Sequence, residues 1–493
     1  MYEYKTQPIA HQLEDLRKAW NKPQWARWWE QGVGKTKPTI DEIAACYERG
    51  IIDAVVILAP NGVHRNWLKD EFEKHMPDRV MKEVRSHVWY SDKTSTKKHQ
   101  RSVEGVFYHE GLAVIAMGYD AVMTKKGKDA WLLFLKKRKC FYILDESSAI
   151  KTPGSKRTQR ILPSSRFAVV LRLLNGTPVD DSPFDVYTQC KMVDPTCWHR
   201  YGIRNFTAFK AYFAIYEERR FLVPQKCKNG RTRETFQKCV AFKNLKDMRN
   251  VLLSVGSRYT KEVLDLPDKV YSKRYFDATP QQGRVYEELK KNYIALLDSG
   301  EEVSADMAMV RMLRLQQILS GYVPSDDSDP KDPEPIPGRN ARLDLLLETV
   351  EPIGNQGIIW SRFTKDVELI ADALGDKAIR CDGTVTGSRR DMALDSFKAG
   401  DAQWLVSNQL TPGVAKGQTF INAKTVIYYA NAFNLNPRLQ SEDRAHRVGQ
   451  KNTVDYIDLI CSGKVDEHIA SRLVEKRSVA SFIQGDEVRD WLE

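Results

Sequence analysis

Short runs of branched apolar residues recur along the chain, each followed by a stretch with helical spacing. The first set comprises Ala54–Ala59, Ala113–Met117, Phe141–Leu144 and Phe167–Leu173. The second set comprises Gly357–Ser361, Gln403–Ser407, Thr425–Ala430 and Val454–Ile460. Near-continuous apolar strands that alternate with helices are typical of parallel sheets covered on both faces. The two sets therefore predict an α/β protein with two lobes, each built on a parallel sheet.

The segments beside these runs have a different pattern. Residues 183–264 and 281–349 have mostly helical spacing, which is clearest where apolar residues recur every three or four positions, at Ala308, Met312, Leu315, Ile318 and Leu319. Within the second segment, Pro324–Gly338 is acidic and rich in proline. Such a stretch cannot bury apolar surface, so we expect an exposed loop or linker there.

The composition narrows the class of protein. The chain has 493 residues, of which 42% are hydrophobic and 29% charged, with a formal net charge of +11. These values are ordinary for a globular protein and exclude a disordered, fibrous or disulfide-scaffold chain. No apolar run approaches the ~18 residues of a membrane span, and the N-terminus lacks the layout of a secretory signal. The positive excess is compatible with a polyanionic partner.

The cysteines favour a reducing compartment. All eight are scattered without close pairing, as expected of free thiols in a cytosolic chain. The densest group, Cys190, Cys197 and His199, lacks the C-x-x-C spacing of a zinc site. We therefore expect core cysteines here rather than zinc ligands.

Gly32-Val33-Gly34-Lys35-Thr36 has the pattern of a phosphate-binding loop, although Trp29 stands at the usual first glycine. Gly32 and Gly34 let backbone N–H groups turn toward phosphate oxygens, and the following helix adds its positive N-terminal dipole. Lys35 is expected to reach the β- and γ-phosphates, and the Thr36 hydroxyl to hold Mg²⁺.

Asp145 and Glu146 follow the apolar run Phe141–Leu144. Acidic residues at the carboxyl end of a parallel strand lie in the crevice where open α/β sheets bind ligands. Asp145 is predicted to hold Mg²⁺ through water, and Glu146 to orient and deprotonate the attacking water. Either motif alone is common, but the two in this order at a normal domain separation indicate a nucleotide hydrolase.

Arg444 and Arg447 lie three residues apart in the second lobe, so on a helix they would share a face. Two guanidinium groups suit the charge that develops on a transferring γ-phosphoryl group. This pair is therefore predicted to complete the catalytic site.

At this point the chain resembles helicase superfamily two, in particular the Swi/Snf group of ATPases that move along double-stranded DNA. The resemblance runs from about Pro8 to Ile483. Its most specific motif is Asp443–Gln450, which matches the group's Asp-Arg-Ala-His-Arg-x-Gly-Gln signature. Further matches are Leu174–Pro178, similar to a Thr-Gly-Thr-Pro coupling motif, and Arg258–Lys261 with Leu266–Lys269, similar to the junction between the lobes.

The resemblance implies two RecA-like lobes, helical protrusions in or after each lobe, and a C-terminal brace helix. The expected divisions are an N-terminal ATP-binding lobe over 1–265, with a protrusion at about 183–264, and a C-terminal lobe over 266–463, with an insertion at about 281–349. The brace helices would occupy 464–493.

The resemblance also implies roles for individual residues. Gln12 would read adenine, Gly417 would belong to a glycine-rich nucleotide-binding loop, and Gln440 would act with Arg444 and Arg447 in catalysis. Gly176 and Thr177 would couple hydrolysis to movement. The implied nucleic-acid contacts are Pro60, Trp67, Gly118, Tyr119, Ser361, Arg362 and Gly383. Trp67 and Tyr119 fit core aromatics equally well.

Three departures from the family pattern stand out. Ser147-Ser148 follows the Asp-Glu pair where many relatives have a small residue and a histidine, so any coupling role of that histidine is missing or replaced. Asn175 replaces the first threonine of the coupling motif, and in the glycine-rich loop only Gly413 and Gly417 carry over. None of these changes touches the predicted catalytic residues.

The resemblance thus implies an ATP- and Mg²⁺-dependent ATPase that translocates on duplex DNA and displaces bound proteins or remodels branched DNA. One alternative is a strand-unwinding or branch-migrating helicase that acts on forks, junctions or RNA–DNA hybrids. Another is a DNA clamp without catalysis, which the intact Lys35, Asp145 and Glu146 argue against. We expect a monomer that binds double-stranded or branched DNA with little sequence preference and does not bind membranes. The bare core, without an appended chromatin-reading, zinc-finger or nuclease pattern, predicts the cytoplasm of a bacterial or virus-infected bacterial cell.

Overall fold

A computed structural model describes residues 2–61, 63–226, 232–298, 305–323, 333–385, 387–409, 411 and 418–484. The chain divides into two compact units. Unit 1 comprises Met1–Phe213, Lys243–Asp265 and Ser478–Val488, and unit 2 comprises Ala214–Phe242, Leu266–Arg477 and Arg489–Glu493. Among the described residues, no helix has both the length and the apolarity needed to cross a bilayer.

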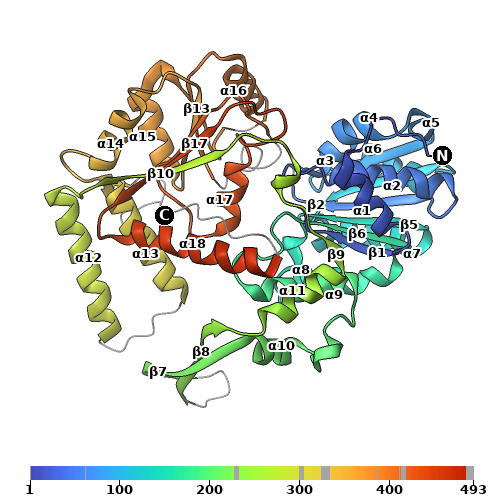
Figure 1. The fold of residues 1–493 in the computed structure, drawn as a ribbon, viewed down its shortest axis with the longest axis horizontal. Helices are drawn as coiled ribbons and strands as arrows, with labels where there is room; N and C mark the ends of the chain where they lie inside the picture. The colour runs from blue at the N-terminus through green and yellow to red at the C-terminus, as the bar shows by residue number, and fades with distance from the viewer. Residues whose placement is uncertain are drawn as a thin grey trace. The chain divides into compact units, whose positions relative to one another are not determined.

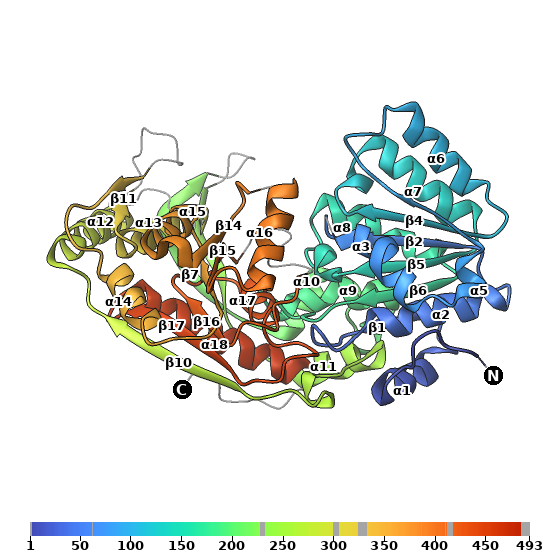
Figure 2. The same ribbon diagram turned by 90° about the horizontal axis from the view of Figure 1, so that it is seen from above.

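Unit 1 is built on a seven-stranded sheet in the order β3-β4-β2-β5-β6-β1-β9 (Figure 2). All neighbouring strands pair in parallel. The strands are β1 (Gln24–Arg27), β2 (Ala54–Ala59), β3 (Val84–Val88), β4 (Leu112–Gly118), β5 (Cys140–Asp145), β6 (Val170–Leu174) and β9 (Gly256–Ser257). The helices are α1 (Ala10–Ala19), α2 (Thr36–Glu48), α3 (Val63–Asn66), α4 (Phe72–His75), α5 (Asp78–Met81), α6 (Lys97–Phe107), α7 (Lys125–Lys137), α8 (Lys156–Ile161), α9 (Val186–Val193), α10 (Phe206–Phe213) and α11 (Leu245–Ser254).

Alternate residues of the central strands face opposite layers of unit 1. Ile40 and Ile43 of α2 pack with Val55 and Ile57 of β2 in one buried cluster. On β5, Tyr142 pairs with Val56, and its ring centroid lies 6.4 Å from that of Trp131 on α7. Because side chains alternate along a strand, α2 and α7 cover opposite faces of the sheet. This double cover explains why the strands are apolar throughout.

Unit 2 is built on a six-stranded sheet in the order β10-β17-β16-β13-β15-β14, also parallel throughout. Figure 1 labels its strands β10, β17 and β13. The strands are β10 (Lys269–Phe276), β13 (Gly357–Ser361), β14 (Ala378–Cys381), β15 (Trp404–Asn408), β16 (Thr425–Tyr428) and β17 (Val454–Cys461). The helices are α12 (Pro280–Asp298), α13 (Ala305–Leu319), α14 (Ala341–Val350), α15 (Thr364–Leu374), α16 (Gly387–Ala399) and α17 (Leu435–Glu442). Helix α18 (Val465–Gln484) begins in unit 2, and its residues from Ser478 on belong to unit 1. Two parallel α/β units are thus confirmed.

The spacing predicts a mostly helical segment over 183–264, but the structure differs. Besides α9, α10 and α11 it contains an antiparallel hairpin, β7 (Ala214–Lys226) and β8 (Thr232–Phe242). Aromatic and β-branched residues favour strands, and in the hairpin Tyr216 pairs with Cys239 and Phe236 with Arg219 rather than forming a helical stripe.

The segment 281–349 contains α12, α13 and α14, as expected. Pro324–Gly338 is only partly the exposed loop that its composition predicted. Residues 324–332 lie outside the described part of the chain, but β12 (Glu334–Pro335) pairs with β11 (Tyr322–Val323), and Ile336 joins a buried cluster. An apolar residue next to prolines can be buried when a neighbouring strand supplies its pairing. Of the predicted brace, 464–493, α18 forms the described part.

Candidate nucleotide-hydrolysis site

The phosphate-binding loop lies between β1 and α2. Gly32 and Gly34 have φ values of 82° and 86°, which L-residues with side chains rarely adopt. Lys35 caps α2, and Thr36 is the first residue of that helix. The Lys35 ammonium donates to the carbonyl oxygens of Trp29 at 2.8 Å and Glu30 at 3.3 Å. The loop therefore combines a positively charged side chain with the N-terminus of a helix.

Side chains of helix α1 contact backbone carbonyl oxygens of this loop. His11 Nε2 lies 3.0 Å from the Val33 carbonyl oxygen, and Gln12 Nε2 donates to the Gly34 carbonyl oxygen at 3.0 Å. Gln12 Oε1 accepts from the Ile9 N–H at 3.0 Å. A Cβ at Gly34 would lie 2.6 Å from Gln12 Nε2. Gln12 thus positions the loop, and its predicted contact with adenine stays a prediction.

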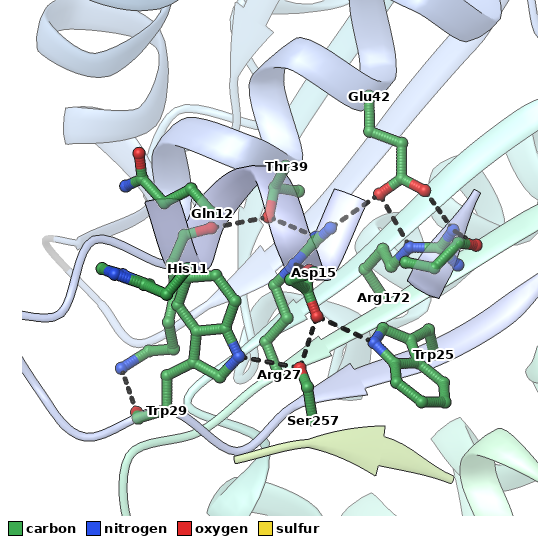
Figure 3. Close-up of polar contacts among 12 residues, drawn as sticks. His11, Gln12, Asp15, Trp25, Arg27, Trp29, Thr39, Glu42, Arg172 and Ser257 are labelled. Carbon is green, nitrogen blue, oxygen red and sulfur yellow. Dashed lines mark hydrogen bonds and ion pairs between the residues drawn. The ribbon is translucent and has the colours of Figure 1, made fainter. Parts of the chain in front are cut away.

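A buried network of ion pairs fixes the elements around the loop (Figure 3). Arg27 on β1 contacts Asp15 at 2.7 Å and Glu42 at 3.0 Å, and Arg172 on β6 donates to the same Glu42 at 2.8 Å. All four side chains are buried. Burial alone would raise the pKa of Glu42, but Arg172 and Arg27 hold it below its ordinary value.

The network reaches the loop through hydroxyl groups. Arg27 Nη1 donates to Thr39 Oγ1 at 2.9 Å, and Thr39 Oγ1 donates to the Lys35 carbonyl oxygen at 2.8 Å. Ser257 on β9 donates to Asp15 and accepts from Trp29 Nε1 at 2.8 Å (Figure 3). Two arginines and two carboxylates balance in charge, so the loop rests on a satisfied polar core rather than on apolar packing.

Asp145 ends β5, and two aromatic residues orient it. Trp67 Nε1 donates to Asp145 Oδ2 at 2.9 Å, and the Tyr119 hydroxyl donates to the Asp145 carbonyl oxygen at 2.8 Å. Burial raises the pKa of Asp145, while the Trp67 N–H and Lys35 oppose that shift. The carboxylate is thus held in one orientation at the strand end.

These contacts fit the alternative that Trp67 and Tyr119 are core aromatics, and their predicted contact with nucleic acid stays a prediction. Both side chains are buried, at 2% and 4% exposed. Their polar atoms point at Asp145 because a buried indole N–H or phenol needs a partner, and the strand end supplies one. In this structure they support the hydrolysis site.

Glu146 adopts the left-handed backbone conformation, with φ 53°. A non-glycine residue there is strained, and such strain is concentrated at functional sites. Gln31 Nε2, from the phosphate-binding loop, donates to Glu146 Oε1 at 3.3 Å. The loop and the acidic pair therefore meet directly. Sequence analysis missed Gln31, although its place one residue before Gly32 could have singled it out.

The predicted coupling residues lie next to these groups. A Cβ at Gly176 would lie 2.8 Å from Gln31 Cγ, so this close approach requires glycine. Arg258 Nη1 donates to the carbonyl oxygens of Trp28 at 2.6 Å and Gly176 at 3.2 Å. Thr177 N–H donates to Asn175 Oδ1 at 3.0 Å. The coupling motif is thus tied to the β1 side of the site.

The predicted magnesium ligands are chemically suitable. The Thr36 hydroxyl and the Asp145 carboxylate are the hard oxygen donors that Mg²⁺ prefers, and Mg²⁺ at phosphates usually takes only one or two protein ligands. Within the described ranges, no group of three or more His, Cys, Asp or Glu side chains could hold a metal ion. That finding does not bear on an ion held mainly by phosphates and water. Cys190 and Cys197 are buried core residues.

The prediction that Arg444 and Arg447 share a helix face required both to lie on a helix, and in the structure they do not. Helix α17 ends at Glu442, and both residues lie in the turns that follow. The backbone tightens there, because the Arg444 N–H donates to the Ser441 carbonyl oxygen at 3.2 Å. This three-residue hydrogen bond is typical of the end of a helix.

The two guanidinium groups nevertheless meet, at the Gln418 carbonyl oxygen. Arg444 Nη1 donates to it at 2.8 Å and Arg447 Nη1 at 3.4 Å. Arg444 is buried and also donates to the Gln440 carbonyl oxygen at 2.9 Å. Arg447 is half-buried and donates to Thr419 Oγ1 at 2.9 Å. Arg444 is therefore held inside unit 2, whereas Arg447 is the more accessible cation.

The remaining predicted nucleic-acid contacts fall into two groups. Ser361 is buried and its hydroxyl donates to Asp366, and its predicted contact with nucleic acid stays a prediction. Gly118 is also buried, and a Cβ there would lie 2.0 Å from Asn61 Oδ1. The more accessible positions are Pro60, Arg362 and Gly383. Gly417 lies outside the described residues.

Arg362 is the charged member of that accessible group. Its guanidinium lies 4.6 Å from the centroid of the Phe433 ring. Burial lowers its pKa to about 10, so it remains a cation near neutral pH. Gly383 lies in a turn that Asp382 closes by accepting from the Thr384 N–H at 2.8 Å.

Comparisons with known proteins identify the family of this chain. The SNF2-related domain model matches residues 29–321, and the helicase conserved C-terminal domain model matches residues 341–449. The chain therefore has the two halves of a helicase-type ATPase. It belongs to the SNF2-related family, which confirms the resemblance inferred from its motifs.

Two curated relatives illustrate the match. A "Probable ATP-dependent DNA helicase" of Arabidopsis thaliana is 26% identical over 92% of this chain and 40% of its own length. "Chromodomain-helicase-DNA-binding protein 1-like" of Danio rerio is 25% identical over 91% of this chain and 40% of its own length. The chain thus spans about two fifths of the length of these relatives.

A solved structure also resembles this chain. It is the SWI2/SNF2 ATPase core of Sulfolobus solfataricus in complex with double-stranded DNA, which is 19% identical in sequence and gives a TM-score of 0.40. The match covers 98% of this chain and 95% of that one.

Proposed function

We propose that this chain is a DNA-stimulated ATPase that couples ATP hydrolysis to movement along double-stranded DNA, displacing bound proteins or remodelling branched DNA. The observation that carries the ATPase assignment is the contact between Gln31 and Glu146, 3.3 Å long. It joins the phosphate-binding loop to the carboxylate that would act as general base. Family membership and relatives named as DNA helicases support the choice of DNA as the track.

In this proposal each candidate site residue of unit 1 has a defined role. Lys35 turns from the loop carbonyls toward the phosphates, and backbone N–H groups of the loop and α2 bind phosphate oxygens. Asp145 and Thr36 would hold Mg²⁺, which when bound neutralises charge that develops on the phosphates. Glu146 orients the attacking water and accepts its proton at a carboxylate oxygen.

The arginines of unit 2 complete the set of charges. Arg447 donates to the γ-phosphoryl oxygens as the bond to the leaving group breaks, and Arg444 keeps the Gln418 segment in place beside it. We propose that these residues act on the same nucleotide as Lys35 during hydrolysis. In this proposal, Arg447 and Lys35 act together on the nucleotide only when duplex DNA is bound, and this dependence couples the chemical step to movement.

The proposal is tested by ATP turnover with duplex, single-stranded, forked or no DNA. We expect duplex to stimulate turnover at least about tenfold, and stimulation to fall steeply with salt because backbone phosphates dominate the contact. Lys35→Ala should abolish turnover on every substrate, whereas the exposed control Lys82→Ala should keep it. Stimulation by single strands or RNA alone would overturn the duplex assignment.

A further inference from the structure

Two motifs that depart from the family pattern meet at one buried side chain. Ser147 directly follows Glu146, and its Oγ donates to Gln189 Oε1 at 2.8 Å. Asn175 directly precedes Gly176, and its Nδ2 donates to the same oxygen at 2.7 Å. All three side chains are completely buried. The loop with the general base and the loop with the coupling motif are thus joined through Gln189.

The other end of the Gln189 amide is equally engaged. Its Nε2 donates to the Pro178 carbonyl oxygen at 2.8 Å and to the Asp185 carbonyl oxygen at 2.8 Å. A glutamine amide has two donor hydrogens and two acceptor lone pairs, so Gln189 makes every hydrogen bond available to it. Neither loop can move past the other without leaving one of these buried groups unpaired, which is costly.

Helix α9 supplies a second, separate tie to the same region. Thr188 Oγ1 donates to the Ile150 carbonyl oxygen at 2.5 Å, and Lys151 pairs with Asp180 at 2.7 Å and Asp181 at 2.6 Å. These contacts fasten α9 and the loops together but do not touch Ser147 or Asn175. Removing these contacts would loosen the region in general, whereas changing Gln189 would break the path between Ser147 and Asn175.

We propose that Gln189 is a positioning residue that, through Ser147 and Asn175, transmits DNA-dependent activation to Glu146. This inference rests on the proposed function, because there is nothing to transmit unless DNA stimulates hydrolysis. The four hydrogen bonds of Gln189 go to Ser147, Asn175, Pro178 and Asp185, which lie outside the phosphate-binding loop. Loss of the relay should therefore act on the rate of hydrolysis and not on the affinity for nucleotide.

The test measures kcat and KM for ATP with and without saturating duplex. Gln189→Leu removes all four hydrogen bonds at similar volume, and we expect the duplex-stimulated kcat to fall about tenfold or more while the KM for ATP changes less than about twofold. Gln189→Glu keeps the acceptor but loses the amide donors, and we expect a similar loss of stimulation. Thr188→Val removes the neighbouring tie and should preserve the ratio of stimulated to unstimulated turnover.

A double-mutant cycle covers the case in which Gln189 variants fold poorly. Ser147→Ala and Asn175→Ala should each lower the stimulated kcat about threefold or more, and the double variant should lose little more, since both act through Gln189. Additive losses, or equal losses with and without DNA, would overturn the relay while leaving the proposed function intact. An unaltered chain that ignores DNA would overturn both.

Discussion

Replacing Glu146 by glutamine should leave ATP binding intact and slow hydrolysis by about 10³-fold, within the range expected for loss of a general base. Glutamine has the same shape, so its amide oxygen can still accept from Gln31. The strained backbone at φ 53° is set by the surrounding strand and loop and should persist. The variant therefore removes the proton acceptor and little else.

The measurement is single-turnover hydrolysis at saturating ATP and duplex, alongside equilibrium binding of a fluorescent ATP analogue. Glu104→Gln, an exposed change on α6, is the matched control and should behave like the unaltered chain. A loss below tenfold for Glu146→Gln would show that another group accepts the proton.

Arg447→Lys should lower kcat by about 10³-fold, the lower end of the effect of an arginine finger in phosphoryl transfer. Lysine keeps the charge but cannot present the planar fork that contacts two oxygens at once. Because Arg447 is half-buried and bonded to Thr419 Oγ1 and the Gln418 carbonyl oxygen, the change should cost little folding stability. The KM for ATP should change much less than kcat.

Comparison with Arg444 separates chemistry from folding. Arg444→Lys breaks bonds from a buried guanidinium to the Gln440 and Gln418 carbonyl oxygens, so it should lower the unfolding temperature as well as the rate. Arg472→Lys on the exposed face of α18 is the control for both. If Arg447→Lys retained more than a tenth of the unaltered kcat, Arg447 would not be the catalytic cation.

Sequence patterns located the buried strands well, because a strand covered on both faces is apolar at nearly every position. Gly357–Ser361 was predicted with the bounds that β13 has. Strands with polar residues were missed: β1 contains the buried Arg27, and β10, at the edge of its sheet, mixes polar and apolar residues and alternates half-buried with exposed positions over most of its length. Only the pairing partner, far away in the sequence, makes such segments strands.

The residues of the candidate site divide in the same way, into those found from local motifs and those placed by contacts between distant segments. Lys35 and the acidic pair were found because short motifs place them at a helix start and a strand end, which are local features. The inward orientation of Trp67 and Tyr119, the roles of Gln31 and Gln189, and the end of α17 before Arg444 depend on contacts between distant segments. No spacing rule within one segment reports such contacts.

The central claim, that ATP hydrolysis moves this chain along duplex DNA, is tested most directly by displacement of a third strand from a DNA triplex. With ATP and Mg²⁺, the unaltered chain loaded on the duplex flank should release the third strand, without separating the two strands of the duplex. Triplexes that stay intact while ATP is hydrolysed on duplex would contradict translocation.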